Sequence, residues 1–571
     1  MKPANSLYFF LLITLYLFIS LIMFNQIEED AFIYFRFAAN IADGHGYVFN
    51  AGGEHIESGS SLIWQFIIAL LCYTPVNIIF ATKLVGIGFG CLALYLVYLI
   101  SKECIADRHL QIIPPALLAV SIPFYCWSQR GLETPFFLCT VLALAYICCN
   151  KKLYRYWHIF AFIVFCARPE GFVILLSIIP FLIFKRKTLP HFVWNVSVLV
   201  ILVCCITFVR IYYFHDLVPH PFYIKMAGGF AYGFDSLIQY LNNNFLVFLM
   251  LPAIPAFFTK RFWSPPLLFV IMPFLVLTTF WFVLGGDDIF KPYDRKIIPA
   301  LAFFCIVVAT AYDRLYKEYY RLFLKVGSLA FVAILLCFAK TLDYDNRVEK
   351  NTPGFFVHTC HSIAASPMGY LSGLYNVFCS DRMPRPYYPQ TMYQHLRLPV
   401  GTNYHATTGE FIKLNYPENI SIVYDQMGQT PWYAGLDKNF TDSWGLTDRY
   451  LGFYSFGQRV GGSLLLRLYN SVALRFFSLV YPSEKRLITE QNALDFIFNK
   501  NPDLILVNQA FQKYLPHTLP AKIEHDPRLR ERYELKYVVN NTVTFYHSRN
   551  LKTAWPLKIP EGCVVTSSPP D

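Results

Sequence analysis

The sequence predicts a polytopic α-helical membrane protein of about 11 transmembrane helices, followed by a C-terminal extracytoplasmic α/β domain. Hydrophobic residues make up 55% of the 571 residues and charged residues only 15%, with a mean hydropathy of +0.40. Such a composition excludes an ordinary soluble enzyme. The apolar runs end before about residue 343, where the chain turns polar. We therefore predict a membrane domain over residues 1–342 and a second domain over residues 343–571.

The first apolar segment, residues 7–24, carries no charge and is long enough to cross a bilayer at about 1.5 Å per residue. No small-residue cleavage site follows it, so we expect an uncleaved anchor. An acidic cluster, Glu28-Glu29-Asp30, emerges directly from this segment. A loop rich in carboxylates, imidazoles and glycines follows, including Asp43-Gly44-His45-Gly46. Acids held at a membrane face indicate chemistry there.

Basic clusters alternate with loops rich in Glu, Asp, Gly, Pro and His along the membrane domain. The positive-inside rule predicts that the basic clusters are cytoplasmic and that the other loops share the opposite face. Because the formal charge of +11 lies largely in these short loops, it favours topology over nucleic-acid binding as its explanation. The clusters are Lys102 with Arg108, Lys151-Lys152 with Arg155, Lys185-Arg186-Lys187, Lys260-Arg261, and Arg314 with Lys317, Arg321 and Lys325.

Counting crossings tests this topology. Residues 62–73 form an apolar run too short to span, which we interpret as re-entrant or interfacial. An odd count of about 11 crossings then places the C-terminal domain outside and the N-terminus in the cytoplasm. Pro169 and Gly171 predict a break between two short helices, which leaves a hollow at the outer face. The spans are 7–26, 77–100, 111–129, 134–149, 156–167, 171–184, 191–209, 245–259, 265–284, 297–312 and 323–340.

Short polar motifs recur in order at the predicted outer ends of these helices. These motifs are Glu29-Asp30, Phe35-Arg36-Phe37, Asp43 to Gly46, Gly131-Leu132-Glu133-Thr134, Arg168-Pro169-Glu170-Gly171, Phe214 to Lys225, Gly285-Gly286-Asp287-Asp288 with Arg295, Asp425 to Gly435, and Gly445-Leu446-Thr447-Asp448. Together they resemble the GT-C superfamily of polyprenyl-phosphate-sugar-dependent glycosyltransferases, most closely the terminal arabinofuranosyltransferase branch known from mycobacterial cell walls.

The resemblance implies a multi-pass enzyme of a bacterial inner membrane that moves a sugar from a polyprenyl-phosphate donor to an extracytoplasmic glycan or glycolipid, with inversion. Two positions depart from the branch. Glu29 replaces the usual first aspartate, and His220 stands where asparagine is usual. The donor sugar therefore stays open.

Sugar transfer needs a general base for the acceptor hydroxyl and a stabiliser for the departing phosphate. Asp30 with Glu29 beside it can supply the base, and the residues alone leave the choice between them open; alternatively the cluster merely marks the end of the first helix. Lys225 and Arg295 are favoured for the phosphate because cations on outer loops run against the positive-inside bias. The full set of candidate substrate-binding residues is Arg36, His45, Glu133, Arg168, His220, Lys225, Asp287 and Arg295.

Some of these candidates also have structural interpretations. Arg168 and Glu170 could hold a turn as an ion pair, and Glu133 could interact with a helix dipole. No Walker-type loop is present, and the glycines of Gly86 to Gly90 lie in an apolar span, where they favour close helix packing. Without a nucleotide-binding loop, the sugar would have to reach the enzyme already activated, as part of a lipid-phosphate-linked donor. Acidic neighbours could hold a divalent cation, although no ligand spacing is diagnostic.

The sequence of the C-terminal domain predicts a mixed α/β structure. We expect strands at 420–424 and 504–507, a helix at 490–499, and a hairpin of 533–539 with 542–547 around Asn540-Asn541. The stretch 429–433 could stack on sugars or fill a core, and Cys360 and Cys379 could form a disulfide. The tail after Ala554 is expected to be loosely ordered.

Two functions other than a transferase agree with the composition. A transporter or flippase of lipid-linked sugars would show acids and broken helices near mid-membrane, often in inverted repeats. Here the charged motifs cluster at one face and no repeat is visible, which favours the enzyme. A glycan-binding membrane scaffold is the second alternative. Membrane lipids are partners in every case.

Overall fold

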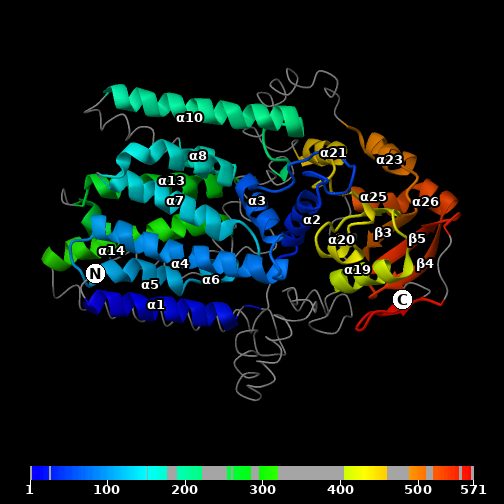
Figure 1. Cartoon of the computed structure of the whole chain (residues 1–571), viewed down its shortest axis with the longest axis horizontal. Coiled ribbons are helices and arrows are strands. Elements are labelled where there is room, and N and C mark those ends of the chain that lie inside the picture. Colours follow the sequence, from blue (N-terminus) through cyan, green and yellow to red (C-terminus); the bar gives the residue numbers. More distant parts are fainter. Residues whose placement is uncertain are drawn as a thin grey trace, which may run out of the picture.

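The computed structural model describes residues 3–22, 24, 27–150, 152–175, 189–221, 254–258, 262–284, 295–318, 404–459, 488–509, 518–551 and 556–566. Figure 1 shows a bundle of long helices at one end of the molecule and an α/β domain at the other, with two short helices, α2 and α3, at the junction. The N-terminus lies at the end of the bundle far from the junction, and the C-terminus lies in the α/β domain.

The bundle is built from apolar helices. Three segments in the described part of the chain are long and apolar enough to cross a membrane: Ile78–Cys104, Phe192–Phe214 and Arg295–Leu315. None of the most apolar window of Phe192–Phe214 is buried, so this surface requires lipid rather than water around it. The chain is therefore a membrane protein, but the count of 11 crossings is not confirmed. The bundle helices are α1 (Pro3–Ile22), α4 (Ile78–Cys104), α7 (Thr134–Cys149), α8 (Trp157–Ala167), α10 (Leu189–Val209), α13 (Pro265–Leu284) and α14 (Ile298–Glu318).

Close packing of α4 depends on two of its glycines. A Cβ on Gly90 would collide with the hydroxyl of Tyr16 in α1, and one on Gly86 would collide with the carbonyl of Ser128. The prediction that these glycines permit close helix contact is confirmed at both positions. Asn77 begins the helix by accepting hydrogen bonds from the backbone N–H groups of Ile79 and Phe80.

The prediction of one continuous helix over 111–129 is wrong. The segment forms a 3₁₀ turn η1 (Leu110–Ile112), then α5 (Ile113–Ala119) and α6 (Ile122–Trp127). Ser121 between α5 and α6 is extended, with ψ 127°, and the following Pro123 has no N–H to continue the ladder of α5. By contrast, the predicted break after α8 is confirmed: Arg168 is extended (φ −162°, ψ 153°) before Pro169.

The described segments that carry basic clusters, at the end of α4, just before α8 and at the end of α14, lie at the end of the bundle far from the junction (Figure 1). Asp313 near the end of α14 accepts hydrogen bonds from the backbone N–H groups of Ala106 and Asp107, just after α4. The described loops that carry polar motifs, just before α2, just before α7 and just after α8, lie at the opposite end, beside the α/β domain (Figure 1). Among the residues that the structure describes, the two loop types are therefore separated, while their sides of the membrane stay a prediction.

Helices α2 (Ala31–Ala42) and α3 (Leu62–Leu71) connect α1 to α4 at the junction. The apolar run at 62–73 was predicted not to span, and it forms only the ten residues of α3. Ser61 caps α3 by accepting from the N–H of Trp64, and Gln65 of α3 donates to the carbonyl of Tyr34 in α2 at 2.9 Å. The two helices therefore form one packed unit against the bundle end.

The α/β domain holds a six-stranded sheet in the order β2-β1-β3-β5-β4-β6. The first three strands in this order are parallel, and the other three pair antiparallel. The strands are β1 (Ser421–Tyr424), β2 (Asn439–Asp442), β3 (Leu504–Asn508), β4 (Tyr533–Val539), β5 (Val543–Ser548) and β6 (Val565–Thr566). The helices are α19 (Tyr404–Asn415), α20 (Gln429–Ala434), α21 (Arg449–Arg459), α23 (Glu490–Asn499), α25 (Leu519–His525) and α26 (Pro527–Arg532).

Most sequence expectations for this domain are confirmed. The strands near 420 and 504, the helix at 490–499 and the hairpin all form, and Asn540 and Asn541 take the positive φ values that the hairpin turn requires (55° and 51°). One expectation is wrong, because part of the tail is ordered and pairs with β4 as β6. The segment 429–433 lies in the helix α20. Cys360, Cys379, most of the spans 171–184, 245–259 and 323–340, and the domain boundary near residue 343 lie outside the described residues.

Candidate active site

Arg36 joins α2 to the α/β domain. All five N–H donors of its guanidinium are used: Nε donates to Phe49 O, Nη1 to Pro431 O and Gly435 O, and Nη2 to Asn50 Oδ1 and Lys438 O. The residue is fully buried. We therefore withdraw Arg36 from the phosphate-binding candidates, because it has no donor left for a phosphate. Its role is to hold the two domains together.

Glu29 makes a second link between the domains. Its Oε1 accepts hydrogen bonds from the backbone N–H groups of Gly428 (2.7 Å) and Gln429 (3.2 Å). A Cβ on Gly428 would collide with Glu29, so only glycine allows this approach. Burial, together with the charge of Asp30, raises the pKa of Glu29 to about 8. Glu29 is thus engaged with the α/β domain.

Asp30, the next residue, has a different environment. It stands at the N-cap of α2, yet its side chain makes no capping hydrogen bond. The carboxylate is 32% exposed, and its Oδ2 lies 4.0 Å from Nη2 of Arg295. Both residues line one pocket at the junction, which we call the Asp30 pocket. Its lining residues are Asp30, Ile33, Tyr34, Ser58, Ser60, Leu132, Glu133, Pro221, Arg295 and Leu446.

Glu133 forms the centre of a buried hydrogen-bonded chain beside this pocket. Its Oε1 accepts from Arg168 at 2.6 Å, and its Oε2 accepts from the hydroxyl of Tyr34 at 3.2 Å. The same hydroxyl accepts from the N–H of Ser61 at 3.1 Å. Gly131, with φ +87°, lets the Glu133 turn pack against α2, because a Cβ there would press on Ala31 at 2.9 Å. These hydrogen bonds therefore hold the side chains of Tyr34 and Glu133 in fixed positions.

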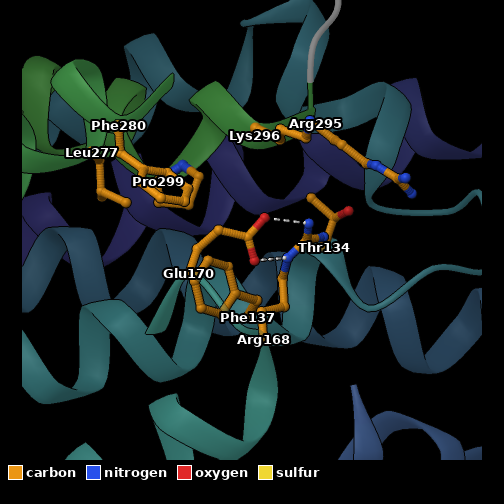
Figure 2. A pocket seen from close by; sticks show the side chains of 9 residues that line it. All are labelled: Thr134, Phe137, Arg168, Glu170, Leu277, Phe280, Arg295, Lys296 and Pro299. Atoms are coloured by element: carbon orange, nitrogen blue, oxygen red, sulfur yellow. Dashed lines mark hydrogen bonds and ion pairs between the residues drawn. The ribbon is translucent and has the colours of Figure 1, made fainter. Parts of the chain in front are cut away.

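A second pocket begins on the other side of Arg295 and is called here the Arg168 pocket (Figure 2). Arg168 and Glu170 lie in its middle, joined by hydrogen bonds of 3.1 and 2.8 Å. Leu277, Phe280 and Pro299 lie on one side of this pair, and the guanidinium of Arg295 points away on the other. Its lining residues are Thr134, Phe137, Arg168, Glu170, Leu277, Phe280, Arg295, Lys296 and Pro299. The pocket thus combines cations with an apolar wall.

Arg295 is held between the two pockets by packing as well as by charge. Its guanidinium lies 5.4 Å from the ring centroid of Trp127, and that of Arg130 lies 4.9 Å from the same ring. Arg130 is also 3.6 Å from the carboxylate of Glu28. Cation–π contact with a buried ring stabilises a guanidinium in one orientation. Arg295 is therefore presented to both pockets in a fixed position.

The remaining predicted residues divide into three groups. Glu133, Arg168 and Arg295 line the pockets, and their role in substrate binding stays a prediction. His45 is exposed in the turn after α2 and lines neither pocket, while His220 is buried and its Nε2 bonds the carbonyl of Gly445 at 2.8 Å. Lys225 and Asp287 lie outside the described residues. The pockets therefore remove support for His45 and His220 as phosphate ligands.

Sequence reasoning missed several lining residues. Lys296 follows Arg295 directly, and a pair of cations at the motif-bearing end of the bundle was a signal that could have found it. Tyr34 and Ser58 gave no signal, because a tyrosine and a serine near a membrane have many ordinary roles. Leu446 was included only as part of a motif, with no role assigned.

This arrangement can perform nucleophilic substitution on a phosphate-bearing substrate. A partly exposed carboxylate can accept a proton, and Arg295 with Lys296 can stabilise negative charge on a leaving phosphate. Apolar groups beside the cations suit a lipid tail. The described residues contain no group of three His, Cys, Asp or Glu side chains that could hold a metal ion, and a divalent cation stays a prediction.

Neither a protein-family model nor a curated protein sequence matches the chain. Solved structures do, among them two crystal structures of one protein. The crystal structure of ArnT from Cupriavidus metallidurans bound to undecaprenyl phosphate has a TM-score of 0.53 at 12% identity, covering 98% of this chain and 100% of that chain. The crystal structure of the same protein in the apo state has a TM-score of 0.52 at 11% identity, covering 95% of this chain and 98% of that chain. At these identities the likeness shows the fold alone: the GT-C fold is confirmed, and the arabinofuranosyltransferase branch is not.

Proposed function

We propose that this chain of GT-C fold is an integral membrane glycosyltransferase that moves a sugar from a polyprenyl-phosphate donor to a glycan or glycolipid acceptor. The observation that carries the proposal is the placement of Asp30 and Arg295 in one pocket, 4.0 Å apart, at the bundle end that faces the α/β domain. A base and a phosphate stabiliser at this distance can act on the two ends of one transfer.

The donor is inferred from the Arg168 pocket. Arg295 and Lys296 offer positive charge for a phosphate, while Leu277, Phe280 and Pro299 offer an apolar surface for the first isoprene units. ArnT, which shares the fold, has been crystallised with undecaprenyl phosphate. The same class of carrier would place its phosphate at Arg295, between the two pockets, and its sugar in the Asp30 pocket.

The transfer follows from these positions. Asp30 accepts the proton of an acceptor hydroxyl, whose oxygen attacks the anomeric carbon of the donor sugar. The bond between that carbon and the phosphate oxygen breaks, and its electron pair leaves with the phosphate. Arg295 and Lys296 stabilise the added charge on the phosphate. Direct displacement inverts the anomeric configuration.

The proposed location is a bacterial inner membrane, with the N-terminus in the cytoplasm and both the pockets and the α/β domain outside. The separation of the described basic loops from the described motif loops supports this orientation. An outward-facing enzyme has no nucleotide sugar supply, so a lipid-linked donor suits this location. The donor sugar, the acceptor and any divalent cation are left to experiment.

The test is glycan profiling of cells that lack the chain and are complemented with wild type, Asp30→Asn or Asp43→Asn, with expression and membrane insertion checked for each. Asp43 is the matched control, because it is an exposed acid at the other end of α2 and lines neither pocket. We expect wild type and Asp43→Asn to restore a missing sugar and Asp30→Asn not to. If Asp30→Asn restores it fully, the catalytic assignment fails and a transporter of lipid-linked sugars becomes the better hypothesis.

A further inference from the structure

The Asp30 pocket has one wall from the α/β domain. Leu446, in the loop between β2 and α21, is half-buried and lines the same pocket as Asp30 and Arg295. All other lining residues of this pocket come from the membrane domain. The α/β domain therefore completes the cavity in which the proposed sugar transfer takes place.

The loop around Leu446 is held in place from both sides. Asp442, at the end of β2, accepts hydrogen bonds from the backbone N–H groups of Trp444 (2.9 Å) and Thr447 (2.8 Å). His220 of the membrane domain bonds the carbonyl of Gly445 at 2.8 Å, and Gly445 has φ +82°, which favours glycine. Leu446 lies between Gly445 and Thr447, and both of these neighbours are held by hydrogen bonds. The Leu446 side chain therefore has little freedom to leave the pocket wall.

The pocket has a polar side and an apolar side. Asp30, Ser58 and Glu133 form the polar side, and the buried hydroxyl of Ser58 has no hydrogen-bond partner among the described residues. Leu446 and Leu132 belong to the apolar side. A sugar hydroxyl placed against Leu446 would lose its hydrogen bonds to water without replacement, which is unfavourable.

Building on the proposed function, we propose that Leu446 is a specificity-determining residue of the Asp30 pocket, which selects sugars that present a bare C–H edge at this wall and discriminates against a hydroxymethyl group there. The exclusion is both steric and polar. Because one extra carbon in an apolar pocket changes discrimination by about 10 to 200-fold, a change at Leu446 alone is enough to alter the preferred sugar.

The experiment compares donors that differ by one hydroxymethyl group: undecaprenyl-phosphate xylose against glucose, and undecaprenyl-phosphate arabinopyranose against galactose. The measured quantity is the ratio of kcat/KM for the hexose to that for the pentose, with purified full-length wild type, Leu446→Ala and Leu446→Phe. Leu414→Ala is the matched control, because Leu414 is 47% exposed on α19 and is not among the residues that line the pocket. Thermal unfolding checks that each variant is folded.

We expect Leu446→Ala to raise the hexose-to-pentose ratio about tenfold or more, Leu446→Phe to lower it, and Leu414→Ala to leave it unchanged. If Leu446→Ala does not fold, Leu446→Val removes a single methylene and should raise the ratio less. An unchanged ratio in folded, active variants would overturn the inference while leaving the proposed transfer intact. If folded wild type transfers sugar from none of the four donors, the proposed function fails for this donor class and this inference fails with it.

Discussion

Glu29 Oε1 and the backbone N–H of Gly428 form a hydrogen bond of 2.7 Å that joins residues 399 positions apart in the chain. The bond connects the segment entering α2, which also carries Asp30, to the N-terminus of α20 in the α/β domain. Arg36 strengthens the same contact through its bonds to Pro431, Gly435 and Lys438. The position of the proposed base therefore depends on how the α/β domain docks.

Glu29 should act through this docking rather than as the base. Its Oε1 needs to be only a hydrogen-bond acceptor, so we expect Glu29→Gln to keep at least a third of wild-type transfer activity. Glu29→Ala removes the acceptor and leaves two N–H groups unpaired, so we expect lower thermal stability and reduced activity together. Asp30→Asn should instead fold normally and lose about 100-fold or more in kcat, the range typical of a general base. Steady-state kinetics and thermal unfolding of the three purified variants distinguish the roles, and equal losses in Glu29→Gln and Asp30→Asn would contradict this assignment.

The docking contact should weaken at alkaline pH. The pKa of Glu29 rises from 4.5 to about 8 on folding, first through burial and then through Asp30. A raised pKa means that the folded state favours the neutral acid, so its contribution to stability is complete below about pH 4.5 and is lost as pH rises through 8. We expect the melting temperature of wild type to fall between pH 6 and 9 by more than that of Glu29→Gln, whose side chain does not ionise. Parallel melting curves for the two proteins would contradict the prediction.

Arg36→Lys should fail as a conservative substitution. A lysine ammonium has three donors and cannot reproduce the five N–H bonds of the Arg36 guanidinium, so a buried carbonyl group such as that of Lys438 would be left unpaired. We expect a loss of about 2 kcal/mol or more in unfolding free energy, measured by thermal or denaturant unfolding in detergent.

Arg530→Lys is the control, because Arg530 is an exposed arginine in α26. This substitution should change the unfolding free energy by less than about 0.5 kcal/mol.

The sequence predicts local features better than long-range pairings. Apolar length identified α4, and the Pro169 break and the Asn540-Asn541 hairpin follow from backbone preferences of single residues. The polar loops could be grouped at one face, because the number of membrane crossings between two loops decides whether they lie on the same side. These features need no knowledge of what each segment touches.

The pairing of Arg36 with carbonyl groups 395 to 402 residues away could not be foreseen. An arginine in an aromatic run near a membrane has the same sequence signature whether it binds phosphate or a carbonyl cluster, and only the tertiary contact decides. The choice between Glu29 and Asp30 has the same character. Both are acids at the end of one helix, and the α/β domain, far along the chain, engages Glu29 and leaves Asp30 in the pocket.

The Arg168–Glu170 pair should show an acid-dependent contribution to stability. Although burial opposes ionisation, the guanidinium of Arg168 holds the pKa of Glu170 at about 2, below its ordinary 4.5. The stabilisation is therefore present above pH 4.5 and is lost as pH falls through 2. We expect Glu170→Gln to lower stability by about 2 to 3 kcal/mol at pH 7, because it removes one of two carboxylates from a buried arginine. The gap between the two proteins should narrow below pH 4.5 in unfolding experiments, and a constant gap from pH 7 to 3 would contradict the pairing.

Arg295 carries the strongest prediction, because it is the only residue that lines both described pockets. If it stabilises the leaving phosphate, Arg295→Ala should lower kcat by about 100 to 1000-fold, as the loss of one donor to a developing charge does in other enzymes. Arg295→Lys keeps the charge but loses the planar fork and part of the contact with Trp127, so it should retain intermediate activity. A role confined to folding would lower the melting temperature of both variants without this graded effect on kcat. Arg155→Ala, an exposed arginine at the far end of the bundle, is the control. Single-turnover transfer with folded protein measures the chemical step directly, and full activity in Arg295→Ala would remove Arg295 from the mechanism.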